Sequence, residues 1–368
     1  WMTNTPGYPG LCRWNPLYLK ATQVFWLINL LNIVIFSGSF FLKSKKAKSI
    51  LSKIAVILAL VYALVFIALC IFLTYPQFTK AAPEYQLNEM TQETKFEKRT
   101  EGPLLRIAVS SDPHFGAGTN SSEATTQILK TIKTENYDAF FCLGDISELG
   151  ISENNYKLAA KTFKEYLGDM PILTVFGNHD ALVNGNVQFG KYFQTKQDKH
   201  YYRIDEGNLH IIVLNLLWDS QDFNREQKNW LIQQLDSIPQ DDIVITLHHA
   251  YGYASGYVDP NSGMLWYDIP DMIKNVDTLL ESYNVELDLA GHNHFLEYLR
   301  NKNTSYGIVG QMGGLQDLDK DYTSPKSLWY DNTDFGFLGI AVYNDRLELS
   351  YKEQNGTVLY STTVNNNR

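Results

Sequence analysis

The sequence predicts an α/β domain of two packed β-sheets with helices outside, preceded by a helical hairpin that crosses a membrane. Three observations support this prediction: two long uncharged apolar runs before residue 80, a strong charge asymmetry along the chain, and short β-branched runs that alternate with amphipathic stretches after residue 104. With 368 residues, 45% of them apolar, the chain has room for about two structural units. The composition excludes a disordered, collagenous or coiled-coil protein.

Two uncharged runs near the N-terminus are long enough to cross a bilayer. One has 22 residues between Lys20 and Lys43, and the other has 26 residues between Lys53 and Lys80. A hydrocarbon core needs about 20 residues of helix, whereas the apolar stretch of a signal peptide has about 7–15 residues. A buried helix of a soluble core is seldom apolar all round for so long. The sequence therefore predicts a retained hairpin over residues 1–80, with helices at about 21–42 and 54–75.

Polar and basic residues of the hairpin predict its packing and orientation. Asn29 and Asn32, spaced i,i+3, place two amides on one helical face, which is expected to pack on another helix. The loop 43–53 holds five lysines and no acid, so it is expected on the cytoplasmic side. The rest of the protein after residue 80 is then expected on the extracytoplasmic side. The chain begins at Trp1, which leaves room for an upstream portion with further helices.

Charge and cysteine content narrow the possible functions. Residues 1–80 carry eight Lys or Arg and no acid, whereas the remainder has 23 basic and 40 acidic residues, a net charge of −17. Nucleic-acid binding depends on a basic surface, so a nuclease is disfavoured. Cys12, Cys70 and Cys142 are widely spaced and form no C-x-x-C pair, which argues against a disulfide framework or a thiolate zinc site. A metal in this protein must be held by nitrogen and oxygen ligands.

After the hairpin, the sequence predicts a mixed-charge, exposed linker over residues 81–103 and a globular domain over residues 104–368. After residue 295 the helical patterns stop and short strands continue. The expected strands are Leu105–Ser110, Ala139–Leu143, Ile172–Phe176, Leu209–Leu217, Ile243–Leu247, Glu286–Ala290, Gly307–Val309, Phe337–Tyr343, Leu347–Tyr351 and Val358–Val364, and the expected helices lie near 122–134, 153–167, 224–237 and 271–283.

Five short polar blocks follow expected strands. Strand ends in α/β sheets share one rim, so distant blocks can converge on one point. Six of the eight histidines fall in these blocks, and only His200 and His210 lie outside. The blocks are Ser111-Asp112-Pro113-His114, Gly144-Asp145, Gly177-Asn178-His179-Asp180, His248-His249 and Gly291-His292-Asn293-His294.

The residue types in these blocks suit a pair of metal ions. Imidazole, carboxylate and amide ligands without thiolate favour Mn, Fe or Zn. A central carboxylate can bridge two metals about 3.5–4 Å apart, and such a pair activates water for an in-line displacement at phosphorus. The sequence has neither a G-x-x-x-x-G-K phosphate loop nor a G-x-S-x-G elbow.

The ordered set D-x-H, G-D, G-N-H-D, H and G-H-x-H resembles the calcineurin-like metallophosphoesterase superfamily, from about residue 105 to the end of the chain. The resemblance implies a four-layer α-β-β-α sandwich and a phosphohydrolase that cleaves a phosphoester by attack of a hydroxide bridging two metal ions. It implies that Asp112, His114 and His294 hold the first metal, that Asp145 bridges, and that Asn178, His248 and His292 hold the second. His179 is implied to face the substrate phosphate and the leaving-group oxygen, and Asp180 to orient its ring. His249 is the ambiguous member of the pair: His248 is favoured as the ligand, with His249 supporting it, but the choice between the two stays open.

Two loops are candidates for selecting the substrate. Residues 251–257, rich in Tyr and Gly, leave the histidine pair directly and suit either a lid over the ester or an aromatic loop packed on its own protein. The loop 310–332, which contains Gly313-Gly314, is expected to border the same rim. A small or lipid-linked phosphoester is the expected substrate. The alternatives are a metal-free scaffold, a nuclease-type phosphodiesterase and an accessory of a membrane receptor or transporter; the ester class and the oligomeric state stay open.

Overall fold

The computed structural model describes residues 15–96, 101–197, 199–261, 263–366 and 368. The chain divides after Lys80 into two compact units. Residues 1–14 of the predicted hairpin and residues 97–100 of the predicted linker lie outside the described residues.

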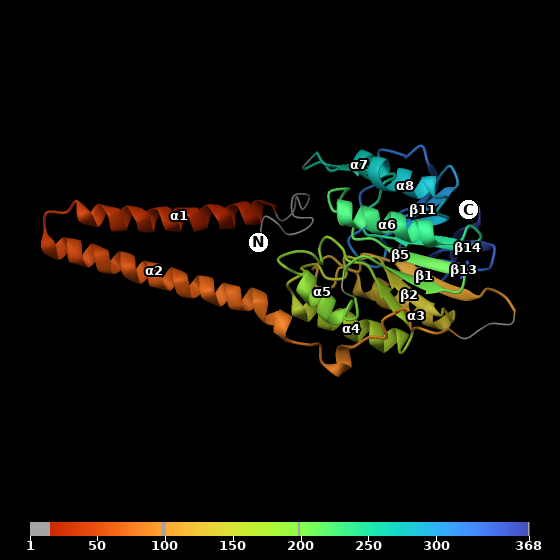
Figure 1. The fold of residues 1–368 in the computed structure, drawn as a ribbon, viewed down its shortest axis with the longest axis horizontal. Coiled ribbons are helices and arrows are strands. Elements are labelled where there is room, and N and C mark those ends of the chain that lie inside the picture. Colours follow the sequence, from red (N-terminus) through yellow and green to blue (C-terminus); the bar gives the residue numbers. More distant parts are fainter. Residues whose placement is uncertain (1–14, 97–100, 198, 262, 367) are drawn as a thin grey trace. The chain divides into compact units, whose positions relative to one another are not determined.

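The N-terminal unit consists of two long helices, α1 (Asn15–Phe40) and α2 (Lys45–Thr74), followed by the short turn η2 (Tyr75–Phe78) (Figure 1). The hydroxyl of Ser44 caps α2 by accepting a hydrogen bond from a backbone N–H in its first turn. The lysine-rich segment, expected as a loop, is therefore mostly the beginning of α2.

Polar side chains meet between the two helices. Asn29 donates a hydrogen bond to the hydroxyl of Tyr62 at 3.4 Å, and the hydroxyls of Ser39 and Ser52 lie 3.1 Å apart. The expected contact of Asn29 with another helix is thus present. Most apolar side chains of both helices are exposed. By length and apolar composition, both helices are candidate membrane spans.

Part of the predicted linker packs on the C-terminal unit. The backbone N–H of Met90 donates to the carbonyl of Ile172, and the N–H of Ile172 donates to the carbonyl of Asn88, both at 2.8 Å. Met90 is buried in the core, and Glu89 accepts hydrogen bonds from the backbone and hydroxyl of Thr195. The expectation of an exposed linker is therefore wrong for Glu89 and Met90, which are buried where this segment pairs with the edge of a sheet. A short turn, η3 (Pro83–Tyr85), precedes them.

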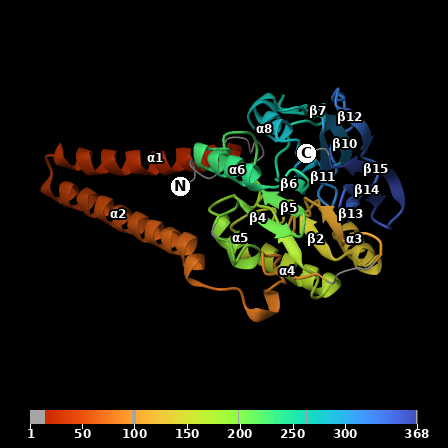
Figure 2. The same cartoon turned by 45° about the vertical axis from the view of Figure 1, so that its right-hand side comes forward.

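Two mixed sheets form the centre of the C-terminal unit (Figures 1 and 2). The first has the order β15-β14-β13-β1-β2-β3, the second the order β12-β10-β11-β9-β6-β5-β4, and β7 and β8 form a separate ribbon. The strands are β1 (Leu105–Ser110), β2 (Ala139–Cys142), β3 (Ile172–Thr174), β4 (Tyr202–Glu206), β5 (Leu209–Val213), β6 (Ile243–Leu247), β7 (Tyr257–Val258), β8 (Leu265–Trp266), β9 (Leu287–Ala290), β10 (Leu296–Asn301), β11 (Thr304–Val309), β12 (Ser327–Asp331), β13 (Gly336–Val342), β14 (Arg346–Glu353) and β15 (Val358–Asn365).

Alternating side chains along the strands create four layers. In β1, Ile107 and Val109 belong to the core between the two sheets, whereas Ala108 packs under the helices of the first sheet. In β5, Ile211 belongs to the same central core and Ile212 packs under the helices of the second sheet. In β1 and β5 both faces are apolar because both are buried. The helices are α3 (Ser122–Thr134), α4 (Glu153–Leu167) and α5 (Asn186–Tyr192) on the first sheet, and α6 (Arg225–Ser237), α7 (Pro270–Met272), the π-helical turn η4 (Ile273–Asp277) and α8 (Thr278–Ser282) on the second.

This architecture confirms the predicted α-β-β-α sandwich. Strands β4, β10 and β12 and the β7–β8 ribbon were not expected, and the helix expected near 271–283 is interrupted by the π-helical turn. Strands β1, β2 and β3 run parallel, as do β5, β6 and β9. Their carboxyl ends therefore place the five polar blocks at one edge of the sandwich.

His200 provides a test of core packing. Its ring stacks on Phe176 with centroids 4.0 Å apart, and its Nδ1 lies 2.8 Å from the amide oxygen of Gln194. Burial lowers the pKa of His200 to about 4. Between pH 6.5 and 4 the unfolded chain binds a proton that the folded chain does not, so stability falls as the pH is lowered through this range.

We expect the unfolding free energy of the wild-type protein to fall by about 2 kcal/mol when the pH is lowered from 7 to 5, because His200 takes up a proton in the unfolded chain and not in the folded chain. His200→Phe should lack this component and show a shallower pH dependence in urea unfolding of the full-length protein. Equal pH slopes for the two proteins would show that His200 is not buried in the neutral form.

Candidate metal centre

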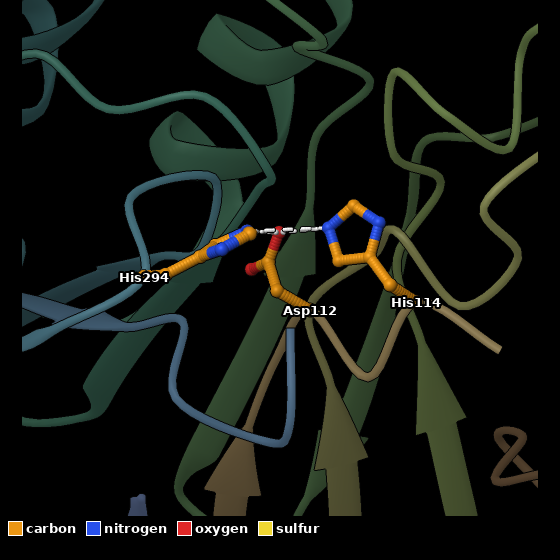
Figure 3. A group of neighbouring side chains, drawn as sticks. All are labelled: Asp112, His114 and His294. Atoms are coloured by element: carbon orange, nitrogen blue, oxygen red, sulfur yellow. Dashed lines mark hydrogen bonds and ion pairs between the residues drawn. The ribbon is translucent and has the colours of Figure 1, made fainter. Parts of the chain in front are cut away.

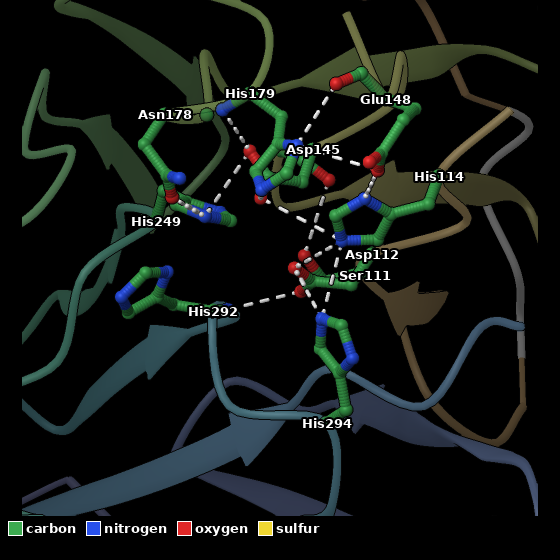
Figure 4. A network of polar contacts seen from close by, with 12 residues as sticks. Ser111, Asp112, His114, Asp145, Glu148, Asn178, His179, His249, His292 and His294 are labelled. Carbon is green, nitrogen blue, oxygen red and sulfur yellow. Dashed lines mark hydrogen bonds and ion pairs between the residues drawn. The ribbon is translucent and has the colours of Figure 1, made fainter. Parts of the chain in front are cut away.

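Residues from all five polar blocks meet in one buried cluster at the edge of the sandwich (Figure 4). Each block follows a different strand: β1, β2, β3, β6 or β9. The residues that face one another are Asp112, His114, Asp145, Asn178, His179, His249, His292 and His294.

Asp112, His114 and His294 form the first group (Figure 3). The carboxylate Oδ1 of Asp112 lies 3.3 Å from Nε2 of His294 and 3.6 Å from Nε2 of His114, and the two nitrogens are 3.2 Å apart. This Oδ1 is buried and has no hydrogen-bond partner among the described residues. Ligand atoms that share one cation at bond lengths of about 2.0–2.2 Å have similar separations. The group therefore fits a metal ion.

Asp145 lies between two sets of imidazole nitrogens. Its Oδ2 is 3.6 Å from Nε2 of His114, and its Oδ1 is 3.4 Å from Nε2 of His249. The same Oδ1 accepts a hydrogen bond from the backbone N–H of His179 at 2.7 Å. The two carboxylate oxygens thus face opposite sides of the cluster.

The second group is built on His249. Its Nε2 lies 2.8 Å from the amide oxygen of Asn178, and its Nδ1 lies 2.8 Å from the carbonyl oxygen of Leu143. Ligand atoms of Asp145, His249 and His292 all lie within 4.8 Å of one another. This group fits a second ion next to the first.

The structure corrects the choice between His248 and His249. Nε2 of His248 lies 2.8 Å from the carboxylate of Asp288 on β9, and its Nδ1 faces the carbonyl of Ala250. Thr246 bonds the same carboxylate. Because side chains alternate along a strand, Thr246 and His248 point to one face and His249 to the other. The expected ligand His248 lies outside the cluster.

Glu148 is a residue of the site that the sequence analysis missed. Its Oε2 lies 2.9 Å from Nδ1 of His114, and its backbone carbonyl oxygen lies 2.9 Å from Nδ1 of His179 (Figure 4). An oxygen acceptor at Nδ1 is a frequent partner of metal-binding imidazole, because it turns Nε2 toward the metal. The sequence feature that could have identified Glu148 is its position three residues after Asp145, a predicted metal ligand.

Asp180 does not orient His179, contrary to the expectation. Its carboxylate accepts hydrogen bonds from the backbone N–H groups of Ile146 and Ser147 and from the hydroxyl of Tyr156. Burial and the neighbouring Asp145 carboxylate raise the pKa of Asp180 to about 7. Asp180 therefore fixes the backbone turn that follows Asp145.

The backbone at the rim has uncommon conformations. Asp112, His114, Asp145 and His292 have φ values between 45° and 71°, a region that non-glycine residues rarely adopt and that is enriched at functional sites. The loop 310–332 does border this rim, as expected: a Cβ on Gly314 would lie 2.9 Å from ring atoms of both His114 and His294. A larger residue at Gly314 would push the two imidazoles apart.

When no cation is bound, protons on histidine rings balance the negative charge of the carboxylates in the cluster. Burial opposes protonation of His114, but Asp112, Glu148 and Asp145 outweigh it and raise its pKa to about 10. At His249, burial is likewise outweighed by Asp145 and Asp112, which raise its pKa to about 9. Burial and the positive charge of His249 lower the pKa of His292 to about 3. Metal ions would compete with the protons on His114 and His249.

The cluster and the sandwich define a class of protein. Residues 105–296 match the family model of the calcineurin-like phosphoesterases. The chain belongs to this family of metal-dependent phosphoric ester hydrolases.

Known proteins support this assignment. The chain is 23% identical over 282 residues to rat tartrate-resistant acid phosphatase type 5, covering 65% of this chain and 82% of the rat protein, and 22% identical over 276 residues to the human protein, with the same coverage. A purple acid phosphatase from yellow lupin superposes with a TM-score of 0.62 at 18% identity, covering 74% of this chain; this chain spans 55% of the lupin chain. GAP50 of Plasmodium superposes with a TM-score of 0.55 at 19% identity, covering 72% of this chain and 89% of that chain. The family and these neighbours imply a dinuclear metal centre.

Proposed function

We propose that this protein is a membrane-anchored phosphohydrolase that binds two metal ions on either side of Asp145. The observation that carries the proposal is the position of Asp145, whose two oxygens face separate groups of nitrogen atoms. In this proposal Asp112, His114 and His294 hold one ion, Asn178, His249 and His292 hold the other, and Asp145 is shared. The absence of thiolate from this set suits Mn, Fe or Zn.

Two such ions would activate water and stabilise charge on the phosphoryl oxygens of a bound ester. The protein itself contributes His179. With its Nδ1 against the Glu148 carbonyl, its Nε2 lies 3.9 Å from Asp145 Oδ2. There it is placed to give a hydrogen bond or a proton to the departing oxygen. The side chains of His179 and His294 keep 10% and 15% of their surface exposed, which leaves a way in for the ester.

The proposed location and substrate class rest on the net charge of the chain after residue 80 and on the N-terminal hairpin. The two apolar helices anchor the protein, and the lysines near their connection favour the cytoplasmic side, so the phosphoesterase domain lies on the extracytoplasmic side. The net charge of −17 after residue 80 disfavours polyanionic substrates. A small or lipid-linked phosphoester fits this setting.

A substrate panel tests this function. The full-length protein in lipid nanodiscs is loaded with Mn, Fe or Zn and given mono- and diesters of nucleotides, sugars and glycerolipids. We expect hydrolysis of at least one ester class that a chelator abolishes and added metal restores. A protein with two bound ions that hydrolyses no ester would contradict the proposal, and equal turnover of soluble and bilayer-embedded esters would remove support for a lipid-linked substrate.

A metal-free scaffold is the second candidate. GAP50, one of the fold neighbours, is the anchor in the inner membrane complex of Plasmodium. The intact ligand groups around Asp145 favour the enzyme over the scaffold. Fewer than one transition metal per chain, together with no hydrolysis, would favour the scaffold.

A further inference from the structure

Aromatic rings surround His292 on the rim of the candidate metal centre. Trp218 lies edge-on to His292 with ring centroids 4.5 Å apart, and Trp266 lies 5.2 Å from it. The two indoles are 5.8 Å apart. Tyr257 and Trp266 are cross-strand partners in the β7–β8 ribbon, with nearly parallel rings. We call Trp218, Tyr257 and Trp266 the aromatic wall.

The aromatic wall is fixed to the metal rim. The amide of Asn293, which lies between His292 and His294, donates a hydrogen bond to the backbone carbonyl of Trp266 at 3.2 Å. Asp317 accepts from the hydroxyl of Tyr257 at 3.1 Å and from the backbone N–H of His294 at 2.8 Å. The ribbon is therefore held in register with the candidate ligands, as a specificity surface requires.

Both indole N–H groups of the wall lack acceptors. Nε1 of Trp218 and Nε1 of Trp266 are buried and have no hydrogen-bond partner among the described residues. Buried indole N–H groups normally find a partner. Both indole rings are half-buried, so a rotation of either ring would present its donor to a ligand that carries hydrogen-bond acceptors.

The three side chains of the wall are uncharged. The wall contacts two titratable side chains, the imidazole of His292 and the carboxylate of Asp317, and in the described part of the chain no Lys or Arg stacks on the three rings. Recognition at this surface therefore depends on stacking and on the indole donors. Both are satisfied by an uncharged, planar heteroaromatic ring.

We propose that the aromatic wall binds the alcohol part of the phosphoester, and that this part carries a planar ring with hydrogen-bond acceptors, as in a nucleoside ester. The proposal rests on the phosphohydrolase function and specifies its substrate class. The metals and His179 would act on the phosphate, while Trp218 and Trp266 hold the ring beside His292.

The test compares two esters with the same kind of leaving group. Adenosine 5′-monophosphate and glycerol 3-phosphate both release a primary alcohol, but only the first carries a ring. For the metal-loaded full-length protein, we expect Trp266→Leu to lower kcat/KM for the nucleotide roughly tenfold, the size of one lost base stack, and to change kcat/KM for glycerol phosphate less than about twofold. Trp230→Leu, on α6 against Tyr201, is the matched control and should change neither.

A second measurement does not depend on hydrolysis. Adenosine is titrated into the metal-free full-length protein while tryptophan fluorescence is recorded. We expect saturable quenching in the wild type that is reduced in Trp266→Phe and Trp218→Phe, which retain an aromatic ring at each position, and unchanged in Trp230→Phe.

The outcomes separate the two proposals. Equal losses for both esters in Trp266→Leu, or no loss for either, would show that the wall is only structural. If the wild type hydrolyses neither ester, the phosphohydrolase proposal fails for these substrates and the titration alone decides. Quenching that depends on Trp218 and Trp266 then supports the wall as a ring-binding surface, and absence of saturable quenching overturns it. If Trp266→Leu does not fold, the two Phe variants give the same decision.

Discussion

Asp145→Asn is expected to lower kcat/KM for any ester that the protein hydrolyses by at least about a thousandfold, more than the 10–100-fold typical of groups that only support metal ligands. Among the described residues, Asp145 is the carboxylate that belongs to both ligand groups: its Oδ2 points to His114 and its Oδ1 to His249. An asparagine has the same shape, but it offers one oxygen and no charge. The variant should therefore lose the shared ligand and bind fewer than two metals per chain.

Asp138→Asn is the matched control for this variant. Asp138 immediately precedes β2, whereas Asp145 follows it, and the Asp138 carboxylate accepts a hydrogen bond from the backbone of Arg106 at 2.7 Å. The control should keep its metal content and its hydrolysis within about twofold of wild type, as is usual for changes away from a site. Circular dichroism checks that both variants fold. Wild-type kinetics in Asp145→Asn would mean that Asp145 is not shared by two metals.

The second large effect separates two neighbouring histidines. We expect His249→Gln to lose one metal ion and at least about 100-fold in kcat/KM, because its Nε2 faces Asn178 and Asp145. His248→Gln should keep both metals. It should instead lower the unfolding free energy by about 1–3 kcal/mol, because it disturbs the hydrogen bonds of the buried Asp288 carboxylate.

Metal content by mass spectrometry and urea unfolding of the two variants measure these effects. We expect His249→Gln to change the metal content and His248→Gln to change the unfolding free energy. Loss of a metal from His248→Gln with full retention in His249→Gln would reverse the assignment made from the structure.

The convergence of the site could be predicted because it depends on topology. Short apolar runs identify the strands, and the carboxyl ends of neighbouring parallel strands meet at one edge. Asp112, Asp145 and His292 are separated by up to 180 positions, yet each lies two residues after the end of a predicted strand, so their meeting required no knowledge of side-chain packing.

The choice between His248 and His249 could not be read from the sequence. In a strand buried on one face, alternation of apolar and polar residues would show which histidine points inward. Strand β6 is buried on both faces: Ile245 belongs to the core between the sheets and Val244 to the core under the helices. Its near-continuous apolar run therefore does not show which of the two histidines that follow it points toward the space between the sheets.

Glu148 and Asp180 illustrate a second limit. Their roles depend on how the chain turns after Asp145, where the backbone enters the left-handed region. In that turn Glu148 reaches His114 and His179, while Asp180 binds the backbone of Ile146 and Ser147. These hydrogen bonds join loops that are distant in the sequence. They depend on the tertiary structure, so residue spacing alone does not predict them.

The central claim is that one carboxylate, Asp145, is shared by two metal ions. Electron paramagnetic resonance of the full-length protein, loaded with two Mn²⁺ per chain, tests it most directly, because ions that share a ligand at about 3.5–4 Å are magnetically coupled. We predict the multiline spectrum of a spin-coupled pair, and its replacement by the spectrum of isolated Mn²⁺ in Asp145→Asn. The spectrum of isolated ions in the wild-type protein at full loading would contradict the account.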